Sequence, residues 1–313
     1  MTSQIKINDT MLGQSCNEIY RASNDHEIKI LSFYYLFENI ENSRNLECEL
    51  DFIKKKCENL SIKGTILVSK EGLNGTISGE KNNIDAIFSE LKNYFESLEQ
   101  KSENDKFEYK FNSSDFIPFS KLKILLKKEV VALQNDLDCL NYNLKPENAN
   151  SQKWEELLAD KNVQLLDTRN DYEYKIGTFD GALNPEIKNF REFKDFLRNS
   201  VETGSLDKEK PCAIFCTGGI RCEKAGIYMK NLGFKDVFQL QGGILKYFEE
   251  TKNASKKWIG DCFVFDDRVT VNDKLEAGDL RCIHCHEKIS TIEEKRSVTK
   301  AKISCSSCKE LKN

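Results

Sequence analysis

One short segment, residues 212–233, restricts the possible folds of this 313-residue chain more than any other. The apolar stretch CAIF is followed by the loop CTGGIR, and the loop by apolar residues at i, i+3, i+4 and i+7, namely Ala225, Tyr228, Met229 and Leu232. Gly233 then supplies a residue suited to a helix C-terminus. A buried strand that leads through a short loop into a helix predicts a parallel sheet covered by helices.

The second half of the chain keeps this alternating order. Strands are expected at 163–166, 212–215 and 237–240, and helices at 154–158, 190–197, 223–232 and 244–250. In parallel sheets with helices on both faces, ligands bind beyond the carboxyl ends of the strands. Cys216 directly follows one of those ends, so it is the first candidate for a reactive residue.

The first half has a different order. Strands are expected at 28–36 and 63–69, with a turn in EGLNG before a partner strand that begins at TISGE, and further strands at 107–111 and 122–133. Helices are expected around 46–60 and 82–98, where apolar residues recur at helical spacing. The order β-α-β-β-α-β resembles a ferredoxin-like fold, which by itself says little about function.

A polar segment without periodicity, NYNLKPENAN at 141–150, marks the expected boundary between the two halves. We therefore expect a polar lead-in at 1–25, a ferredoxin-like domain at 26–140, an α/β domain at 141–255 and a C-terminal extension at 256–313. The fold class is mixed α/β and α+β. The oligomeric state is left open.

The composition, 39% hydrophobic and 31% charged, is that of a soluble globular protein. No apolar run approaches the roughly 18 residues that cross a bilayer, and MTSQIKINDT does not resemble a secretory signal. We therefore expect a cytoplasmic protein without a membrane partner. In a reducing compartment the twelve cysteines are expected to be metal ligands, catalytic thiols or inert core residues rather than disulfides.

The net charge of −4 gives no global sign of nucleic-acid binding, but basic residues cluster locally. The clusters are 54–56, 121–128 (KLKILLKK) and 252–257 beside Trp258. Each is open to two interpretations, an RNA contact or a solvated face of a helix or strand.

The loop that starts at Cys216 has the composition of an anion-binding site; its other residues are Thr217, Gly218, Gly219, Ile220 and Arg221. Two glycines allow successive N–H groups to point inward, and the following helix adds the positive end of its dipole. With the charge of Arg221, these groups should lower the pKa of Cys216 and stabilise a thiolate or persulfide. The alternative is a small buried core cysteine.

The position of the arginine separates this loop from cysteine-dependent phosphatases. Those enzymes place an arginine six residues after the cysteine and usually a histidine before it. Here Arg221 comes five residues after Cys216, Cys222 occupies the sixth position, and Phe215 precedes the cysteine. The shorter loop suits one extra sulfur or oxygen atom on Cys216 better than a phosphate.

Four cysteines near the C-terminus have the spacing of a metal site. Cys282 and Cys285 form one C-x2-C pair, Cys305 and Cys308 form another, and 19 residues (286–304) separate them. This spacing predicts a structural tetrahedral zinc site, with an iron–sulfur cluster or free thiols as alternatives. His284 and His286 flank the first pair and are expected to be bystanders.

Several stretches together resemble the bacterial rhodanese-related tRNA uridine hydroxylases: DTRNDYEYKIGTFDGALNP, CTGGIRCEKA, KGTILVSKEGLNGTISG, KLKILLKKEVVAL and FVFDDRV. The resemblance runs from about residue 28 to the C-terminus, and it implies a rhodanese domain at 141–255. It also implies oxygen-dependent conversion of the wobble uridine of tRNA (U34) to 5-hydroxyuridine, with O2 as co-substrate. It departs at Leu125 and Leu126, where a basic residue is expected.

The resemblance also suggests supporting residues around Cys216. Asp167 and Arg169 are expected to form an ion pair that holds the loop, with direct catalysis as the alternative. Cys222 is expected either to resolve an oxidised or persulfidated Cys216 as a disulfide or simply to pack in the helix.

Three functions remain in competition: a tRNA uridine hydroxylase, a sulfurtransferase that carries a persulfide on Cys216, and a redox- or metal-sensing module without catalysis. The sequence contains no recognisable flavin, haem or nucleotide motif, and with three histidines in the chain we expect no facial-triad iron site. The hydroxylase interpretation is favoured because a sulfurtransferase for small acceptors needs no additional N-terminal domain.

Overall fold

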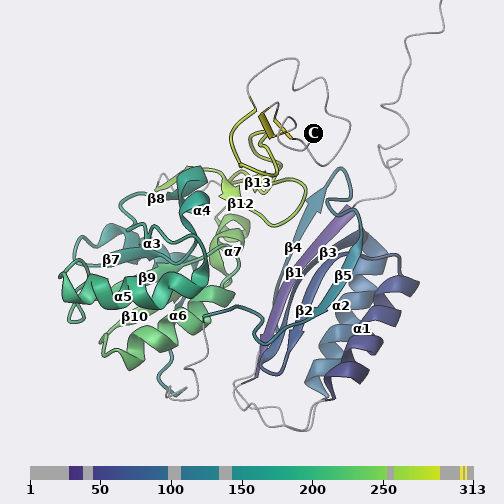
Figure 1. Cartoon of the computed structure of the whole chain (residues 1–313), viewed down its shortest axis with the longest axis horizontal. Helices are drawn as coiled ribbons and strands as arrows, with labels where there is room; N and C mark the ends of the chain where they lie inside the picture. The colour runs from purple at the N-terminus through teal and green to yellow at the C-terminus, as the bar shows by residue number, and fades with distance from the viewer. Residues whose placement is uncertain are drawn as a thin grey trace, which may run out of the picture.

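The computed structural model describes residues 28–37, 45–97, 107–133, 143–251, 257–289, 304–305 and 307–308. Figure 1 shows an N-terminal sheet with two helices beside a parallel-sheet unit, and the C-terminal extension above both. The lead-in at 1–25, the boundary between residues 140 and 141, and residues 252–256 of the third basic cluster lie outside the described residues.

The N-terminal domain has the predicted β-α-β-β-α-β order, followed by the further strand that was expected to begin at residue 122. Its antiparallel core has the strand order β4-β1-β3-β2, and β5 pairs in parallel with the free edge of β2. The elements are β1 (Ile28–Leu36), α1 (Leu46–Asn59), β2 (Lys63–Ser69), β3 (Gly72–Glu80), α2 (Lys81–Glu96), β4 (Phe107–Ser114) and β5 (Leu122–Leu126).

Alternation along β1 gives this sheet two different faces. Leu31, Phe33 and Tyr35 belong to the apolar cluster that packs under α1 and α2. The residues between them, Ser32 and Tyr34, point to the opposite face, where the second domain lies (Figure 1). The sheet therefore has one face closed by helices and one face available for a site.

Two expectations for this domain were wrong in detail. The turn lies at residues 70–71, and β3 already begins at Gly72. A Cβ on Gly72 would lie 1.9 Å from the carbonyl oxygen of Tyr35, so this glycine allows close strand pairing rather than a turn. The last strand ends at Leu126 and does not extend to residue 133.

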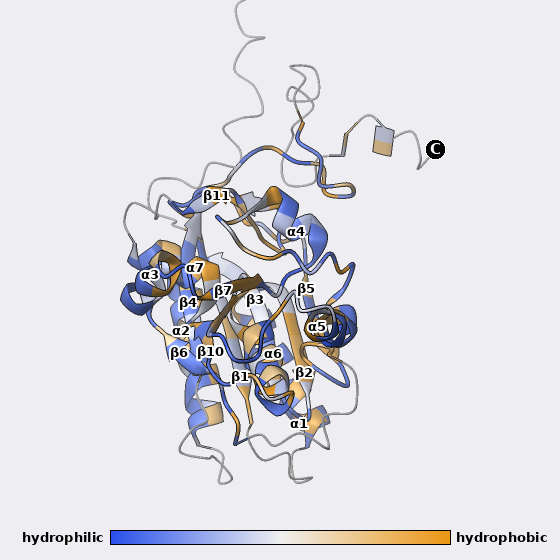
Figure 2. Cartoon of the chain, turned by 90° about the vertical axis from the view of Figure 1, so that its left-hand side faces the viewer, coloured by the Kyte–Doolittle hydropathy of each residue, from blue (hydrophilic) through white to orange (hydrophobic). Residues whose placement is uncertain are grey.

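The second unit contains the predicted parallel sheet, with strand order β6-β10-β9-β7. Helices α5 and α6 pack on one face, α3 and α7 on the other, and Figure 2 shows the hydrophilic and hydrophobic sides of helices such as α5. The elements are β6 (Glu147–Ala149), α3 (Ser151–Ala159), β7 (Gln164–Asp167), α4 (Asp171–Ile176), β8 (Gly177–Phe179), the 3-10 helix η2 (Phe190–Glu192), α5 (Phe193–Glu202), β9 (Cys212–Phe215), α6 (Ile220–Asn231), β10 (Val237–Leu240) and α7 (Gly243–Glu250).

Three local features of this unit differ from the expectations. The polar segment 141–150 contains the edge strand β6, which owes its place to backbone pairing with β10. The chain after β7 contains α4, a helix that was not expected, and its capping box joins Asn170 and Glu173. Helix α6 begins at Ile220, three residues earlier than expected, so the loop itself is limited to residues 216–219.

The C-terminal extension adds three short strands, β11 (Trp258–Gly260), β12 (Cys262–Phe263) and β13 (Thr270–Val271). Strand β11 pairs with β8 of the second unit, while the backbone N–H of Asp267 donates to the carbonyl of Pro118 in the first domain. The extension thus contacts both domains. Across the described residues, no helix combines the length and the apolar character that a membrane span requires.

Candidate active site and cysteine cluster

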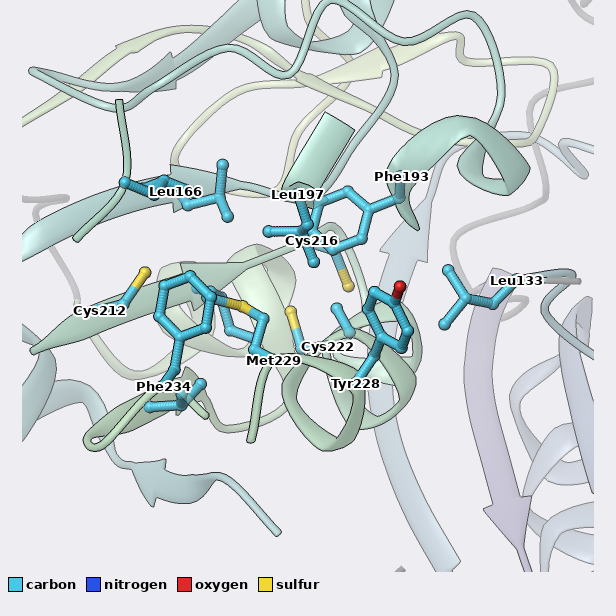
Figure 3. Packing of buried hydrophobic residues seen from close by; sticks show 14 of the residues in the cluster. Leu133, Leu166, Phe193, Leu197, Cys212, Cys216, Cys222, Tyr228, Met229 and Phe234 are labelled. Carbon is cyan, nitrogen blue, oxygen red and sulfur yellow. The ribbon is translucent and has the colours of Figure 1, made fainter. Parts of the chain in front are cut away.

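Cys216 is the first residue after β9, and its side chain is completely buried. The backbone N–H of Gly219 points back to its sulfur, with a distance of 3.1 Å between N and Sγ. Figure 3 shows Cys216 and Cys222 within the core cluster that also contains Phe193 and Leu197. The predicted inward curl of the glycine loop is therefore present.

The start of α7 holds the loop from behind. The N–H groups of Ile244 and Leu245 donate to the carbonyls of Cys216 and Thr217, at 3.0 and 3.1 Å. Gly243 has a φ of 71°, and a Cβ there would lie 2.5 Å from the Cys216 carbonyl oxygen. Only glycine permits this approach of two backbones.

The environment of Cys216 favours the thiolate. Burial raises the pKa of this thiol, but four groups act more strongly in the other direction. They are the hydrogen bond from the Cys222 thiol, the charge of Arg221, and the backbone N–H groups of Cys222 and Arg221, and together they lower the pKa to about 5. Burial and the neighbouring Cys216 sulfur raise the pKa of Cys222, which thus acts as the proton donor of the pair.

Arg221 also forms an ion pair that the sequence did not indicate. Its guanidinium forms a two-pronged ion pair with Glu173 on α4, with both N–O distances at 2.7 Å. Burial raises the pKa of Glu173, yet Arg221 and Arg169 outweigh this and lower it. Thr217 also donates to Glu173, at 3.3 Å, so α4 fixes the loop in place.

Asp167 and Arg169 form the expected ion pair, with 2.7 Å between Nη2 and Oδ2 and neither side chain exposed. The same Arg169 nitrogen donates to the carbonyl of Gly177, and Thr178 donates to Asp167 at 3.0 Å. The pair ties the end of β7 to β8. Its contacts are those of a structural support, and no described contact joins it to the Cys216 sulfur.

Lys110 reaches from the N-terminal domain into the loop. Its ammonium group donates to the carbonyls of Gly218 and Gly242, at 2.5 and 2.6 Å, and only 6% of the residue is exposed. Burial lowers its pKa to about 8, against the opposing charge of Cys216. A lysine from β4 therefore stabilises the loop of the other domain.

Two residues of α6 in turn contact the N-terminal domain. Glu223 accepts a hydrogen bond from Tyr34 of β1 at 3.0 Å. Lys224 pairs with Glu71 and Glu129, both at 2.8 Å. The letters EK in the string CTGGIRCEK thus mediate contacts between domains.

These contacts surround a cavity of about 390 Å³ between the two domains and the extension. This volume lies within the roughly 300–1,000 Å³ typical of small-molecule sites. The walls come from the open sheet face (Ser32, Tyr34, Thr65, Asn74, Thr76, Lys110), from the loop (Cys216, Thr217, Gly218, Ile220, Arg221) and from the extension (Val264, Phe265, Asp266, Arg268). Cys216, with its lowered pKa, lies in the wall of this cavity.

The open sheet face contributes polar side chains to that wall. Ser32 and Thr76 are register partners on β1 and β3, and their hydroxyl oxygens lie 3.2 Å apart. Thr76 is in turn the register partner of Thr65 on β2. A row of hydroxyl groups therefore faces the loop, suited to a polar ring with donors and acceptors.

Cys282, Cys285, Cys305 and Cys308 come together in the extension, with all four sulfurs within 4.8 Å of one another. The sulfurs of Cys285 and Cys305 are 3.7 Å apart, close to the ~3.8 Å expected between two thiolates on one tetrahedral zinc. Backbone N–H groups of His284 and Cys305 point at the Cys282 sulfur, at 3.5 and 3.3 Å. The donor set fits a structural metal ion.

Sequence reasoning missed three groups that build the site: Glu173, Lys110 and the polar sheet face. A signal existed for Lys110, since it is a charged residue in the strand FEYKF at a position that the structure buries. Glu173 lies in the DTRNDYEY stretch, and nothing in the neighbouring residues indicates that its carboxylate is buried.

Each half of the chain matches a known protein family. Residues 28–130 match the model of the UPF0176 acylphosphatase-like domain, and residues 151–250 match that of the rhodanese-like domain. The order of the two matches agrees with the two sheets.

The full-length relatives carry both parts. The chain is 40% identical to the tRNA uridine(34) hydroxylase of Wolbachia pipientis subsp. Culex pipiens, over 90% of this chain and 95% of the relative. It is 39% identical to the protein of that name from Wolbachia pipientis wMel and 37% identical to that from Neorickettsia sennetsu, at similar coverage (90% and 89% of this chain, 96% and 95% of the relatives). Identity at this level, over nearly the whole of each protein, means that the chain belongs to the tRNA uridine(34) hydroxylase family.

Proposed function

We propose that this protein hydroxylates uridine 34 of tRNA to 5-hydroxyuridine in the cytoplasm, with O2 as co-substrate and Cys216 as the reactive residue. The observation that carries the proposal is the position of Cys216, a stabilised thiolate on the wall of a cavity that a single base can enter. The names and full-length coverage of the relatives support the substrate.

In this proposal the segments 26–140, 141–255 and 256–313 each supply one wall of the cavity. A uracil base inserted between the domains would face the hydroxyl row of Ser32, Thr76 and Thr65 with its polar edge. Enzymes that act on a base commonly extrude it into a closed pocket of this type.

The electron balance of the reaction gives Cys222 a role. Hydroxylation replaces the C5–H bond by a C5–OH bond with one atom of O2, and the other atom leaves as water. That second atom needs two electrons and two protons. Oxidation of the Cys216 thiolate and the Cys222 thiol to a disulfide releases both electrons and one proton, and the other proton comes from solvent. Cys222 is the proposed second thiol, because it donates a hydrogen bond to the Cys216 sulfur, and a cellular thiol would then reduce the pair.

The test is mass spectrometry of tRNA nucleosides from cells that lack the gene and carry either wild type or Cys216→Ser. We expect 5-hydroxyuridine to return with wild type and not with Cys216→Ser. The matched control is Cys212→Ala, a buried thiol four residues away on β9, which should restore the modification. Equal levels in the Cys216→Ser cells and the wild-type cells would reject the role of Cys216.

Sulfur transfer is the second candidate, because the N–H group of Gly219 and the short loop also suit a persulfide on Cys216. A thiosulfate-to-cyanide assay on the purified chain tests it directly. Turnover that depends on Cys216, together with unchanged 5-hydroxyuridine in the deletion strain, would favour this candidate over the first.

We further propose zinc as the metal of the four-cysteine cluster, with a role in folding, since a closed four-thiolate site has no open position. Metal analysis of the purified full chain should give about one zinc per protein. Cys285→Ser should lower this content and the melting temperature together. A zinc content near zero in wild type would refute the assignment.

A further inference from the structure

A second cavity, of about 300 Å³, adjoins the cavity of Cys216. The two share one wall, formed by Thr65, Phe119, Val264, Phe265 and Asp266. The second cavity continues along β5 to Lys121 and Lys123 and ends near Ile283 and His286 of the extension. The two cavities therefore lie side by side, and a ligand longer than one base that follows this wall would contact both.

Phe265, in the shared wall, is 63% exposed, more than any other large hydrophobic side chain among the described residues. Its ring is held from behind by Phe263, edge to face with centroids 5.1 Å apart. The guanidinium carbon of Arg221 lies 5.9 Å from the ring centroid, which links Phe265 to the Cys216 loop. An aromatic ring that is fixed in place but left open to solvent offers a stacking surface for a base.

The charges around the second cavity favour a phosphate backbone. Lys121, directly before β5, and Lys123, on β5, are both exposed at its border. The carboxylate of Asp266 is already compensated by Arg268, with N–O distances of 2.9 and 2.7 Å, while Asp267 contributes one further carboxylate. Two lysines beside an aromatic ring are a common arrangement in sites for single-stranded RNA.

We propose that the second cavity binds the nucleotide next to the target uridine, with its base stacked on Phe265 and its phosphates contacted by Lys121 and Lys123. This inference rests on the proposed function, because it assumes that RNA enters the cavity of Cys216. It assigns FVFDDRV and the first half of KLKILLKK to substrate binding. This role also accounts for the contacts of the extension with both domains, because those contacts hold the ring of Phe265 between them.

The test measures binding of a labelled anticodon stem-loop that contains uridine 34, by fluorescence anisotropy, to wild type and Phe265→Ala. Loss of a stacking ring should weaken binding about 10-fold. Phe265→Tyr keeps a ring and should bind like wild type, whereas Phe265→Leu should not. Ile259→Ala removes another exposed apolar side chain, 56% exposed and outside both cavities, and should bind like wild type.

The neighbour itself is tested with stem-loops that lack the base on one side or the other of uridine 34. On one of these RNAs, the affinity of wild type should fall by the same factor by which Phe265→Ala weakens binding of the intact stem-loop. The loss of that base should not weaken the binding of Phe265→Ala any further. Additive losses on both RNAs would overturn the proposal. Phe265→Ala that binds like wild type, while wild type still hydroxylates the intact stem-loop, would overturn it and leave the proposed function standing. Absence of hydroxylation by wild type would instead reject the proposed function.

The phosphate contacts are tested through the salt dependence of binding. Lys121→Gln/Lys123→Gln should make the slope of log affinity against log salt shallower by roughly 1 to 1.5. The matched control is Lys161→Gln/Lys210→Gln, two exposed lysines that line neither cavity. Identical slopes for both double variants would show that Lys121 and Lys123 do not contact the backbone.

Discussion

Cys212 and Cys216 lie four residues apart on the same strand-loop unit, and neither is exposed at all. Burial alone raises the pKa of Cys212 to about 12. For Cys216 burial acts in the same direction, yet its pKa falls to about 5 because hydrogen-bond donors and Arg221 surround the sulfur. Burial by itself therefore does not decide the protonation of a thiol, whereas the hydrogen-bond donors around the sulfur do.

The difference in donors has a backbone origin. Within the sheet the N–H of Cys212 is already used, since it donates to the carbonyl of Asp236. Where the strand ends, the ladder no longer uses the N–H groups, and the turn through Gly219 into α6 directs them at Cys216. The position of a cysteine relative to a strand end therefore matters more than its depth in the core.

The largest effect expected from this comparison is on reactivity. At neutral pH Cys216 should be almost entirely thiolate and Cys212 entirely thiol, so alkylation by a small reagent through the cavity should favour Cys216 by at least ~1,000-fold. The rate at Cys216 should rise with pH through about 5 and then level off. Peptide mass spectrometry after timed alkylation measures both sites, and a midpoint near that of a free thiol would show that the loop does not acidify Cys216.

The same pKa predicts a pH-dependent stability. The folded-state pKa of Cys216 lies below that of an unfolded thiol, so the thiolate form stabilises the fold. This contribution is complete above the unfolded pKa of about 8.5 and is lost as the pH falls toward 5. The difference in unfolding free energy between wild type and Cys216→Ser should therefore shrink on acidification, as urea melts at several pH values would show.

Glu173→Gln tests how the loop charge is balanced. The change leaves the buried charge of Arg221 uncompensated, which should cost about 3 kcal/mol of unfolding free energy. It should also lower the pKa of Cys216 further, because Arg221 then acts on the sulfur without its partner. Asp171→Asn on the same helix is the control: its partner Lys175 is 70% exposed, and the loss should stay below about 1 kcal/mol. A rise in the Cys216 pKa would contradict this balance.

Lys110→Met should have a smaller effect on stability, about 2 kcal/mol, since the carbonyls of Gly218 and Gly242 lose a charged donor. The pKa of Cys216 should rise, because a positive charge leaves its surroundings. Urea melts and the alkylation profile measure the two effects. Lys92→Met on α2, whose pairing with Glu96 is long at 3.9 Å and exposed, is the control. An unchanged alkylation profile would show that the N-terminal domain does not act on Cys216.

The sequence predicted features that depend on local periodicity. The strand, glycine loop and helix at 212–233 were correct because apolar spacing and glycines report directly on backbone geometry. The β-α-β-β-α-β order and the two-faced parallel sheet were confirmed for the same reason. The four C-terminal cysteines also came together, as the spacing of the two C-x2-C pairs predicted.

Features that depend on long-range pairing were not predictable. Lys110 is 108 residues from Gly218 in the chain, and nothing in FEYKF says which domain its side chain enters. The polar strand β6 was missed because an edge strand needs only backbone partners. The cavity itself arises from three segments, so no single stretch of sequence contains it.

The smallest effect is expected from a change at Cys212. Cys212→Ala removes one sulfur atom from the core cluster and should cost about 1 kcal/mol of unfolding free energy. Because Cys212 stays neutral, the variant should leave the pKa of Cys216 and the tRNA modification unchanged. The alkylation profile of Cys216 in Cys212→Ala measures this. A shifted profile would mean that packing inside β9, and not only the donors at its end, sets the acidity of Cys216.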